Sequence, residues 1–213
     1  MLTVYGEGRG FRVVWLLEEM GLPYRLRPVD MLAGVENDPE FLAINPAGFI
    51  PALVDGDVVM VESIAIMEYL MARHGPTSLA PDPQEPAFAP YQQFLHLGEA
   101  GLAASMFFVV VAQILAPEDE KDNWGSRKAM ATFESRRAIV ERRLAQAPYM
   151  AGDSFTAADI SITYALQFAR RAGGVALSAA EQAYVARTTD RDGYRRAMDA
   201  CRATKAWAES LGE

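Results

Sequence analysis

Cysteine and histidine are scarce in this chain of 213 residues, which contains one Cys and two His. The single cysteine, Cys201, excludes a disulfide within the chain, a Cys-x-x-Cys redox pair and a zinc site built from several cysteines. With only His74 and His96 present, the metalloprotease motif His-Glu-x-x-His is absent as well. We therefore expect neither a disulfide framework nor a metal site.

Basic clusters and long apolar runs are also missing. The chain has 28 acidic and 20 basic residues, for a net charge of −8, and this charge repels a phosphate backbone. Nucleic acid is therefore not an expected partner. The longest apolar stretch, MFFVVVAQILA at 106–116, contains Gln113 and is too short to span a bilayer, and the first residues lack the pattern of a secretory signal. We expect a cytoplasmic protein without a membrane partner.

The apolar pattern of the first 75 residues predicts strands alternating with helices. The expected order is strand, helix, strand, helix, hairpin, helix, which is typical of a small α/β layer structure. Strands are expected at LTVYG (2–6) and YRLRPVD (24–30), a hairpin at PALVDGDVVMV (51–61), and helices at FRVVWLLEEM (11–20), DPEFLAI (38–44) and ESIAIMEYLMARH (62–74).

Local signals support these boundaries. Asp38 is a candidate N-cap with Pro39 in the first helical position, and Asp55-Gly56 is a dipeptide typical of hairpin turns. In the first helix, apolar residues recur at helical spacing and Gly21 provides a stop, so Arg12, Glu18 and Glu19 are expected on its polar side.

The chain changes character after a proline-rich stretch. GPTSLAPDPQEPAFAP (75–90) has five prolines and little apolar periodicity, which indicates a linker. Beyond it the patterns are helical only. In SFTAAD (154–159), Thr156 and Asp159 have capping-box spacing, and Phe155 and Ile160 stand at the positions of a hydrophobic staple. The predicted organisation is an α/β domain at 1–76, a linker at 77–87 and an all-helical domain at 88–213.

Several of these motifs, in this order, resemble the cytosolic glutathione transferase superfamily, bacterial type. The resemblance covers essentially the whole chain and rests on four segments: VVWLLEEMGLPY, FLAINPAGFIPALVDGD, VESIAIMEYL and SFTAAD. It implies a thioredoxin-like N-terminal domain that binds glutathione, followed by an all-α domain that provides a pocket for an electrophile. The relatives are usually homodimers, so a homodimer is expected here by analogy.

The resemblance also implies a set of glutathione-binding residues. The Ile50–Pro51 bond would be cis, and the main chain of Ile50 would pair with the cysteinyl residue of glutathione. Ser63 and the amides at the start of its helix would bind the γ-glutamyl carboxylate, and Glu62 would bind the ammonium group. From the residues alone, Pro51 could instead be an ordinary trans proline at a strand start, with Ser63 a helix cap and Glu62 a complement to the helix dipole.

The turn GEGRGF (6–11) departs from the family pattern. Related enzymes use a hydroxyl or thiol in this turn to stabilise the glutathione thiolate, and many bacterial members place Ser or Cys approximately where Arg9 and Gly10 stand. Here the turn has no Ser, Thr or Cys. The catalytic candidates are therefore the Tyr5 phenol and the Arg9 guanidinium, with the backbone amides of the turn as a third possibility. Glu7 would oppose thiolate formation if it faced the sulfur.

A second departure lies at position 49. Phe49 stands where many relatives have a Lys or Gln that contacts the glycyl carboxylate of glutathione, and Phe cannot supply that charge. Arg12 is a conceivable substitute, although an exposed helical arginine is the commoner explanation. Both departures bear on catalytic competence more than on the fold.

The expected function is conjugation of reduced glutathione to small hydrophobic electrophiles, as in detoxification. By resemblance the electrophile pocket lies near the helix that carries Met106, Phe107, Phe108 and Val110, although an apolar run is often plain core. Two alternatives are a non-catalytic binding or regulatory module with the same fold and a glutathione-dependent isomerase or lyase.

Overall fold

The computed structural model describes residues 1–31 and 34–202, and the chain divides into two compact units. Among the described residues, unit 1 is formed by 1–31, 34–77 and 190–202, and unit 2 by Ser78–Thr189. The predicted domain boundaries follow the sequence continuously. The packing instead groups the last described helix, which was expected in the helical domain, with the N-terminal residues.

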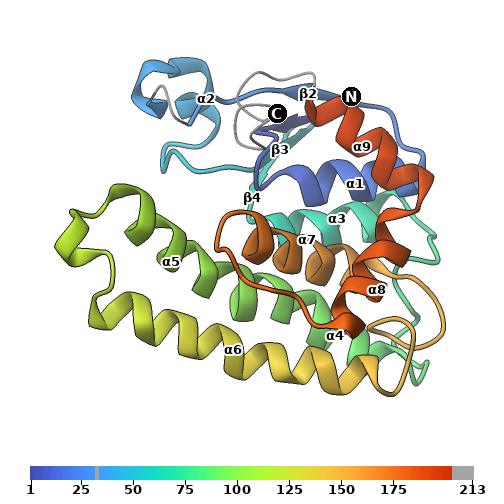
Figure 1. Cartoon of the computed structure of the whole chain (residues 1–213). Helices are drawn as coiled ribbons and strands as arrows, with labels where there is room; N and C mark the ends of the chain where they lie inside the picture. Colours follow the sequence, from blue (N-terminus) through green and yellow to red (C-terminus); the bar gives the residue numbers. More distant parts are fainter. Residues whose placement is uncertain (32–33, 203–213) are drawn as a thin grey trace. The chain divides into compact units, whose positions relative to one another are not determined.

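Unit 1 is an α/β structure in which the predicted order of elements is confirmed (Figure 1). Its elements are β1 (Leu2–Tyr5), α1 (Phe11–Met20), β2 (Tyr24–Arg27), a 3-10 helix η1 (Val35–Asn37), α2 (Pro39–Ile44), β3 (Ala52–Asp55), β4 (Val58–Val61), α3 (Ser63–His74) and α9 (Asp192–Arg202). The predicted cap of α2 is present, because the Asp38 carboxylate accepts a hydrogen bond from the Phe41 N–H at 3.0 Å. Gly21 ends α1 in the left-handed conformation, as expected.

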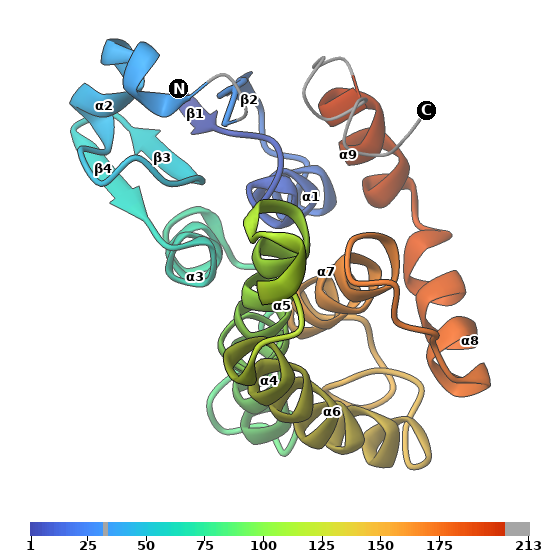
Figure 2. The same ribbon diagram turned by 60° about the vertical axis from the view of Figure 1, so that its left-hand side comes forward.

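The four strands form one mixed sheet in the order β2-β1-β3-β4, in which β1 is parallel to β2 and the other pairs are antiparallel. Tyr5 and its cross-strand partner Ala52 pack with Phe41 of α2 on one face. Alternate residues of a strand point to opposite faces, so Val4 and Leu53 face the other side. Helices α1 and α3 cover that side (Figure 2).

Helix α9 packs alongside α1 and covers a face that the sequence predicted to be polar. Arg12 and Trp15 are both fully buried. The expectation that Arg12 lies exposed on the polar side of α1 is therefore wrong. Helix α9, which comes from the far end of the chain, packs against α1, and its Tyr194 ring meets Trp15 edge to face at a centroid distance of 4.9 Å.

Two acidic residues near the end of α1 hold the arginines of this C-terminal segment. Glu19 accepts hydrogen bonds from the guanidinium of Arg191 at 2.8 and 2.7 Å, and Glu18 accepts one from Arg196 at 2.7 Å. The hydroxyl of Tyr24 also donates to Glu18 at 2.7 Å. Burial and this carboxylate raise the pKa of Tyr24. The attachment of α9 therefore combines apolar packing with two ion pairs.

Unit 2 contains helices only among its described elements. They are α4 (Phe88–His96), a π-helix η2 (Leu97–Ala103), α5 (Ala104–Leu115), a 3-10 helix η3 (Glu118–Glu120), α6 (Trp124–Leu144), α7 (Ala157–Arg171) and α8 (Ala179–Thr189). The fold class predicted from the sequence, a thioredoxin-like domain combined with a helical domain, is confirmed.

Helix α7 is the most buried helix of unit 2. Its predicted capping box is present, and the Asp159 carboxylate accepts hydrogen bonds from the N–H groups of Thr156 and Met150 and from the Tyr184 hydroxyl, at 2.8–2.9 Å. Burial raises the pKa of Asp159, and these donors oppose the shift. Gly98 allows η2 to approach α7 closely, because a Cβ at Gly98 would lie 2.7 Å from the backbone of Ser161 in α7.

One helical run in the described part of the chain is long and apolar enough to cross a membrane. It extends over Phe88–Leu115, where its most apolar window has a mean hydropathy of 1.7. The run is longer than the apolar stretch found in the sequence because α4, η2 and α5 join end to end. In that window 56% is buried inside the protein, as in a core helix of a soluble protein, so the run is weak evidence for membrane insertion.

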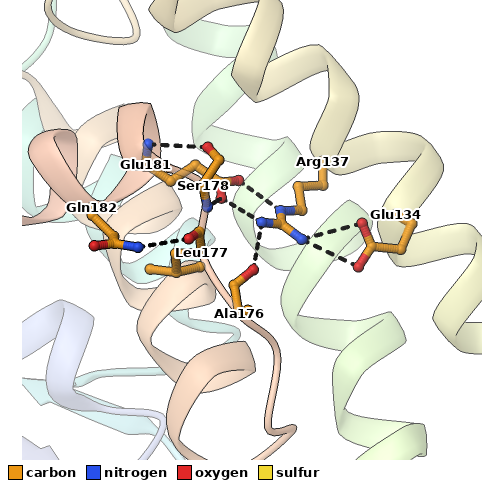
Figure 3. Close-up of polar contacts among 7 residues, drawn as sticks. All are labelled: Glu134, Arg137, Ala176, Leu177, Ser178, Glu181 and Gln182. Atoms are coloured by element: carbon orange, nitrogen blue, oxygen red, sulfur yellow. Dashed lines mark hydrogen bonds and ion pairs between the residues drawn. The ribbon is translucent and has the colours of Figure 1, made fainter.

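A buried ion pair links α6 to the start of α8 (Figure 3). The Arg137 guanidinium donates to Glu181 at 2.7 and 2.5 Å and to the Ala176 carbonyl at 2.8 Å. The Glu181 side chain is completely buried, and it also accepts a hydrogen bond from the Ser178 N–H at 2.8 Å. The Glu181 hydrogen bonds raise the pKa of Arg137, which therefore stays charged. These contacts join α6 to residues 176–181, which lie 39 to 44 positions later in the sequence.

We predict that Glu181→Ala lowers the free energy of unfolding by about 3 kcal/mol, because the change leaves a buried guanidinium without its main partner. Urea denaturation followed by circular dichroism measures this loss. Glu134→Ala is the matched control: Glu134 contacts the same guanidinium at 3.3 Å but is half exposed, so its removal should cost less than about 1 kcal/mol. Equal effects of the two variants would contradict the prediction.

Candidate functional site

The sheet brings three segments of unit 1 to one edge. Tyr5 pairs with Ala52, and Ala52 pairs with Val61, so these residues form one row across the sheet. The strand β1 ends at this row, β3 begins there and β4 ends there. The residues that come next are therefore neighbours: the glycine-rich turn after β1, Ile50–Pro51 before β3, and Glu62–Ser63 after β4.

The glycine-rich turn is packed tightly against Ile50. A Cβ on Gly6, whose φ is +84°, would lie 2.4 Å from the Ile50 side chain, and a Cβ on Gly8 would lie 3.4 Å from it. A Cβ on Gly10 would lie 1.9 Å from the Gly6 carbonyl oxygen. No residue with a side chain fits at Gly6 or Gly10 without a backbone shift. Of the two positions where relatives carry Ser or Cys, only Arg9 therefore accommodates a side chain.

The loop before β3 is held by Asn45, a residue that the sequence analysis did not single out. The Asn45 side chain donates to the Phe49 carbonyl at 2.6 Å and accepts from the Ala47 N–H at 3.1 Å. Asn45 is buried, and its own carbonyl accepts from the Gly48 N–H at 3.0 Å. These bonds fix the backbone that leads into Ile50. The Ile50–Pro51 bond is cis, as expected.

At the start of α3, Glu62 has the only positive φ of a non-glycine residue in the described part of the chain, +71°. Such a conformation is costly and is often found at functional sites. Glu62 occupies the N-cap position, and its side chain forms no capping bond. Ser63 is the first helical residue and is buried. The N–H groups of this helix terminus are therefore not satisfied by a side-chain cap, which leaves them suited to a carboxylate.

Tyr5 is largely occupied in packing. Its ring is buried, stacks on Phe41 with a centroid distance of 6.1 Å, and lies 5.8 Å from the guanidinium carbon of Arg27. Ile50 packs against the same apolar cluster. Arg27 is itself paired with Asp38, and the hydrogen bond from Arg27 lowers the pKa of that carboxyl. Tyr5 thus lies near Ile50 with its ring on the α2 face of the sheet.

Glu7 lies on the other side of the β1 end. Its Oε2 atom accepts a weak hydrogen bond from the Val29 N–H at 3.3 Å, and Oε1 is buried without a hydrogen-bond partner among the described residues. Val29 follows β2, whereas Ile50 precedes β3, and β1 lies between these strands. The carboxylate of Glu7 is therefore directed toward β2, away from Ile50. Arg9 is half-buried in the same turn.

Cys201 is a buried residue of α9. Burial raises the pKa of its thiol to about 12, and the carboxylates of Glu7 and Glu18 contribute to the shift. A thiol with this pKa is almost entirely protonated at neutral pH. Cys201 is therefore unsuited to act as a nucleophile.

The four candidate pocket residues of unit 2 divide into two kinds. Met106 and Val110 are buried in the helical unit, whereas Phe107 and Phe108 are 40% and 65% exposed. Ile114, Leu115 and Trp124 are exposed as well. Only Phe107 and Phe108 among the four therefore offer apolar surface outside the core of the unit. Among the described residues, no group of three His, Cys, Asp or Glu side chains is arranged to hold a metal ion.

Comparison with known proteins connects this arrangement to one family. Residues 1–72 match the model of the glutathione S-transferase N-terminal domain, and residues 127–203 match that of the C-terminal domain. The chain is 33% identical to glutathione S-transferase 3 of Zea mays over 70% of this chain and 68% of that protein. It is 29% identical to glutathione S-transferase GstB of Escherichia coli K12, over 76% and 80% of the two chains.

A solved structure agrees with these matches. The theta class glutathione S-transferase of Xanthomonas axonopodis pv. citri, determined with glutathione bound, superimposes with a TM-score of 0.77 and 27% identity. The superposition covers 92% of this chain and 96% of that one. The likeness therefore extends over both units of the fold.

Proposed function

Because the chain belongs to the glutathione S-transferase family, we propose that it binds reduced glutathione at this sheet edge and directs its thiolate at small apolar electrophiles. The observation that carries the proposal is the start of α3. There, Glu62 is held in a costly conformation beside amides without a side-chain cap. Glu62 follows Val61, which pairs with Ala52, so it lies at the same edge of the sheet as Ile50. This geometry suits a γ-glutamyl group beside a cysteinyl residue.

In this site the γ-glutamyl and cysteinyl parts of the peptide each have a partner. The amides at the start of α3 and the Ser63 hydroxyl bind the γ-glutamyl carboxylate, Glu62 binds the ammonium group, and the main chain of Ile50 pairs with the cysteinyl residue. The thiol then lies near the turn at 6–10. Loss of its proton to solvent leaves a thiolate, which forms the new carbon–sulfur bond while the leaving group departs with the bonding electrons. Binding of both substrates supplies proximity.

We predict that Glu62→Ala and Ser63→Ala each weaken glutathione binding by about tenfold or more, since each removes a hydrogen bond to a charged group. Calorimetric titration of the purified variants measures the affinity. Asp57→Ala is the control, because Asp57 is an exposed acidic residue in the turn at the other end of the β3–β4 hairpin. Unchanged affinity in both site variants would show that glutathione does not bind at this edge of the sheet.

The proposal also includes the groups that stabilise the thiolate. Of the sequence candidates, Arg9 belongs to the turn that touches Ile50, and a nearby cation favours a thiolate. Tyr5 precedes the turn, and its ring is used in packing with Phe41. Glu7, which would oppose ionisation, is directed away. We therefore assign stabilisation to Arg9 together with the amides of the turn, and keep Tyr5 as the alternative donor.

We expect Arg9→Gln to raise the pKa of the bound glutathione thiol by about one unit and Tyr5→Phe to leave it unchanged. Ultraviolet absorbance of the thiolate, followed across pH at saturating glutathione, measures both. The reverse result would transfer the role to Tyr5. Absence of any thiolate signal at neutral pH in the unmodified protein, with glutathione still bound, would favour the second candidate function, a binding module without transferase activity. The lack of a hydroxyl or thiol side chain in the turn supports that alternative.

The homodimer and the cytoplasmic location stay predictions. Exposed apolar side chains occur on both units, at Val58 and Val59 in β4 and at Phe108, Ile114 and Leu115 in α5. Burial of such surface in a two-fold interface would be favourable. Sedimentation of the purified protein as two chains is the expected result, and sedimentation as a single chain at micromolar concentration would contradict the dimer.

A further inference from the structure

The direction of the bound peptide follows from the sheet. In antiparallel pairing with Ile50, the residue that precedes the cysteine aligns with Pro51, and the residue that follows it aligns with Phe49. Pro51 lies in the row next to Glu62, which agrees with a γ-glutamyl group at the start of α3. The C-terminal end of the peptide therefore extends toward Phe49 and the loop at 45–49. This placement rests on the proposed function.

The chain segment that forms that end carries no basic residue. Residues 28–72, which contain α2, the loop, the hairpin and the start of α3, include eight acidic residues and no Lys, Arg or His. The loop itself, NPAGF at 45–49, is uncharged, and its one amide side chain, that of Asn45, is used to hold the Phe49 carbonyl and the Ala47 N–H. Phe49 is the apolar residue of the loop and is 37% exposed.

Three arginines of unit 1 outside this segment do not supply a cation to that end. Arg27 forms a bidentate pair with Asp38, the N-cap of α2, and a longer contact with Glu40 at 3.4 Å. Arg12, which the sequence analysis considered as a substitute for the missing Lys or Gln, is completely buried. Arg9 lies in the turn that meets the thiol side of Ile50. A carboxylate at the C-terminal end of the peptide would therefore lie beside a phenyl ring, within an acidic segment.

We propose that Phe49 makes this end of the site selective for a neutral or apolar group. The protein would then accept γ-glutamylcysteinyl thiols without requiring a free glycyl carboxylate. The substrate class would then be thiols with an intact γ-glutamylcysteine part and a variable C-terminal end. Glutathione belongs to this class, and its carboxylate contributes nothing to affinity. Phe49 acts as a specificity-determining residue through an apolar contact, and Asn45 positions it.

The test compares three thiols on the full-length protein: glutathione, glutathione monoethyl ester, in which the glycyl carboxylate is esterified, and γ-glutamylcysteine. Calorimetric titration of each at low ionic strength measures the dissociation constants. The ester is expected to bind at least as tightly as glutathione. Tighter binding of glutathione than of the ester by tenfold or more would overturn the proposal.

Two variants sharpen the result. Phe49→Lys places a cation at the end of the peptide and should shift the ratio of affinities toward glutathione by roughly twofold to fivefold, the size expected for an exposed ion pair. Phe49→Leu keeps the apolar surface and should leave the ratio unchanged. An unchanged ratio in Phe49→Lys would also overturn the inference, because the C-terminal end would then lie elsewhere.

The outcomes separate this inference from the function on which it rests. If none of the three thiols binds, the proposed glutathione site fails and the inference fails with it. If glutathione binds and the ester does not, the proposed glutathione site stands, and only the inference that the site prefers a neutral C-terminal group is wrong. Thermal unfolding of Phe49→Lys and Phe49→Leu shows whether both remain folded, so that a change in ratio is compared between two folded proteins.

Discussion

The antiparallel pairing of β3 with both β1 and β4 is the constraint on which the candidate site depends. The register of strand pairing decides which face each side chain occupies and which strand ends lie side by side. The row that contains Tyr5, Ala52 and Val61 therefore determines which loops meet. A slip of one residue would separate Glu62 from Ile50 and direct Tyr5 to the opposite face. The hydrogen bonds of Asn45 and the close contact between Gly6 and Ile50 then fix the loops on either side.

The charges of the candidate site do not match those of the proposed ligand equally at both ends. The ligand proposed for it carries two carboxylates and one ammonium group, and residues 28–72, which form most of the site, include eight acidic residues and no basic one. The proposal assigns one carboxylate to the amides at the start of α3, where the helix dipole is positive, and assigns the thiolate to Arg9 and the turn. The proposal assigns no comparable partner to the remaining carboxylate. A site with this charge distribution is expected to bind the γ-glutamyl end firmly and to tolerate changes at the other end.

Prediction from sequence succeeded where the signal was local. The Asp38 cap, the hairpin around Gly56 and the capping box of Thr156 and Asp159 each depend on residues within a few positions of one another, and all are present. It failed for Arg12, which is completely buried although the helical pattern places it on the polar side of α1. It also missed Asn45, since nothing in the sequence indicates that this amide bonds to the Phe49 carbonyl.

The sequence by itself determined the elements, their order and the family, because capping, turn chemistry and apolar periodicity act over short distances. It also established that the turn after β1 has no hydroxyl or thiol. Tertiary structure alone decided that Gly10 cannot carry a side chain, that Glu7 points away from Ile50, and that α9 belongs with the α/β unit. Each of these depends on which surfaces meet after folding, and such contacts join residues whose separation in the sequence carries no local signal.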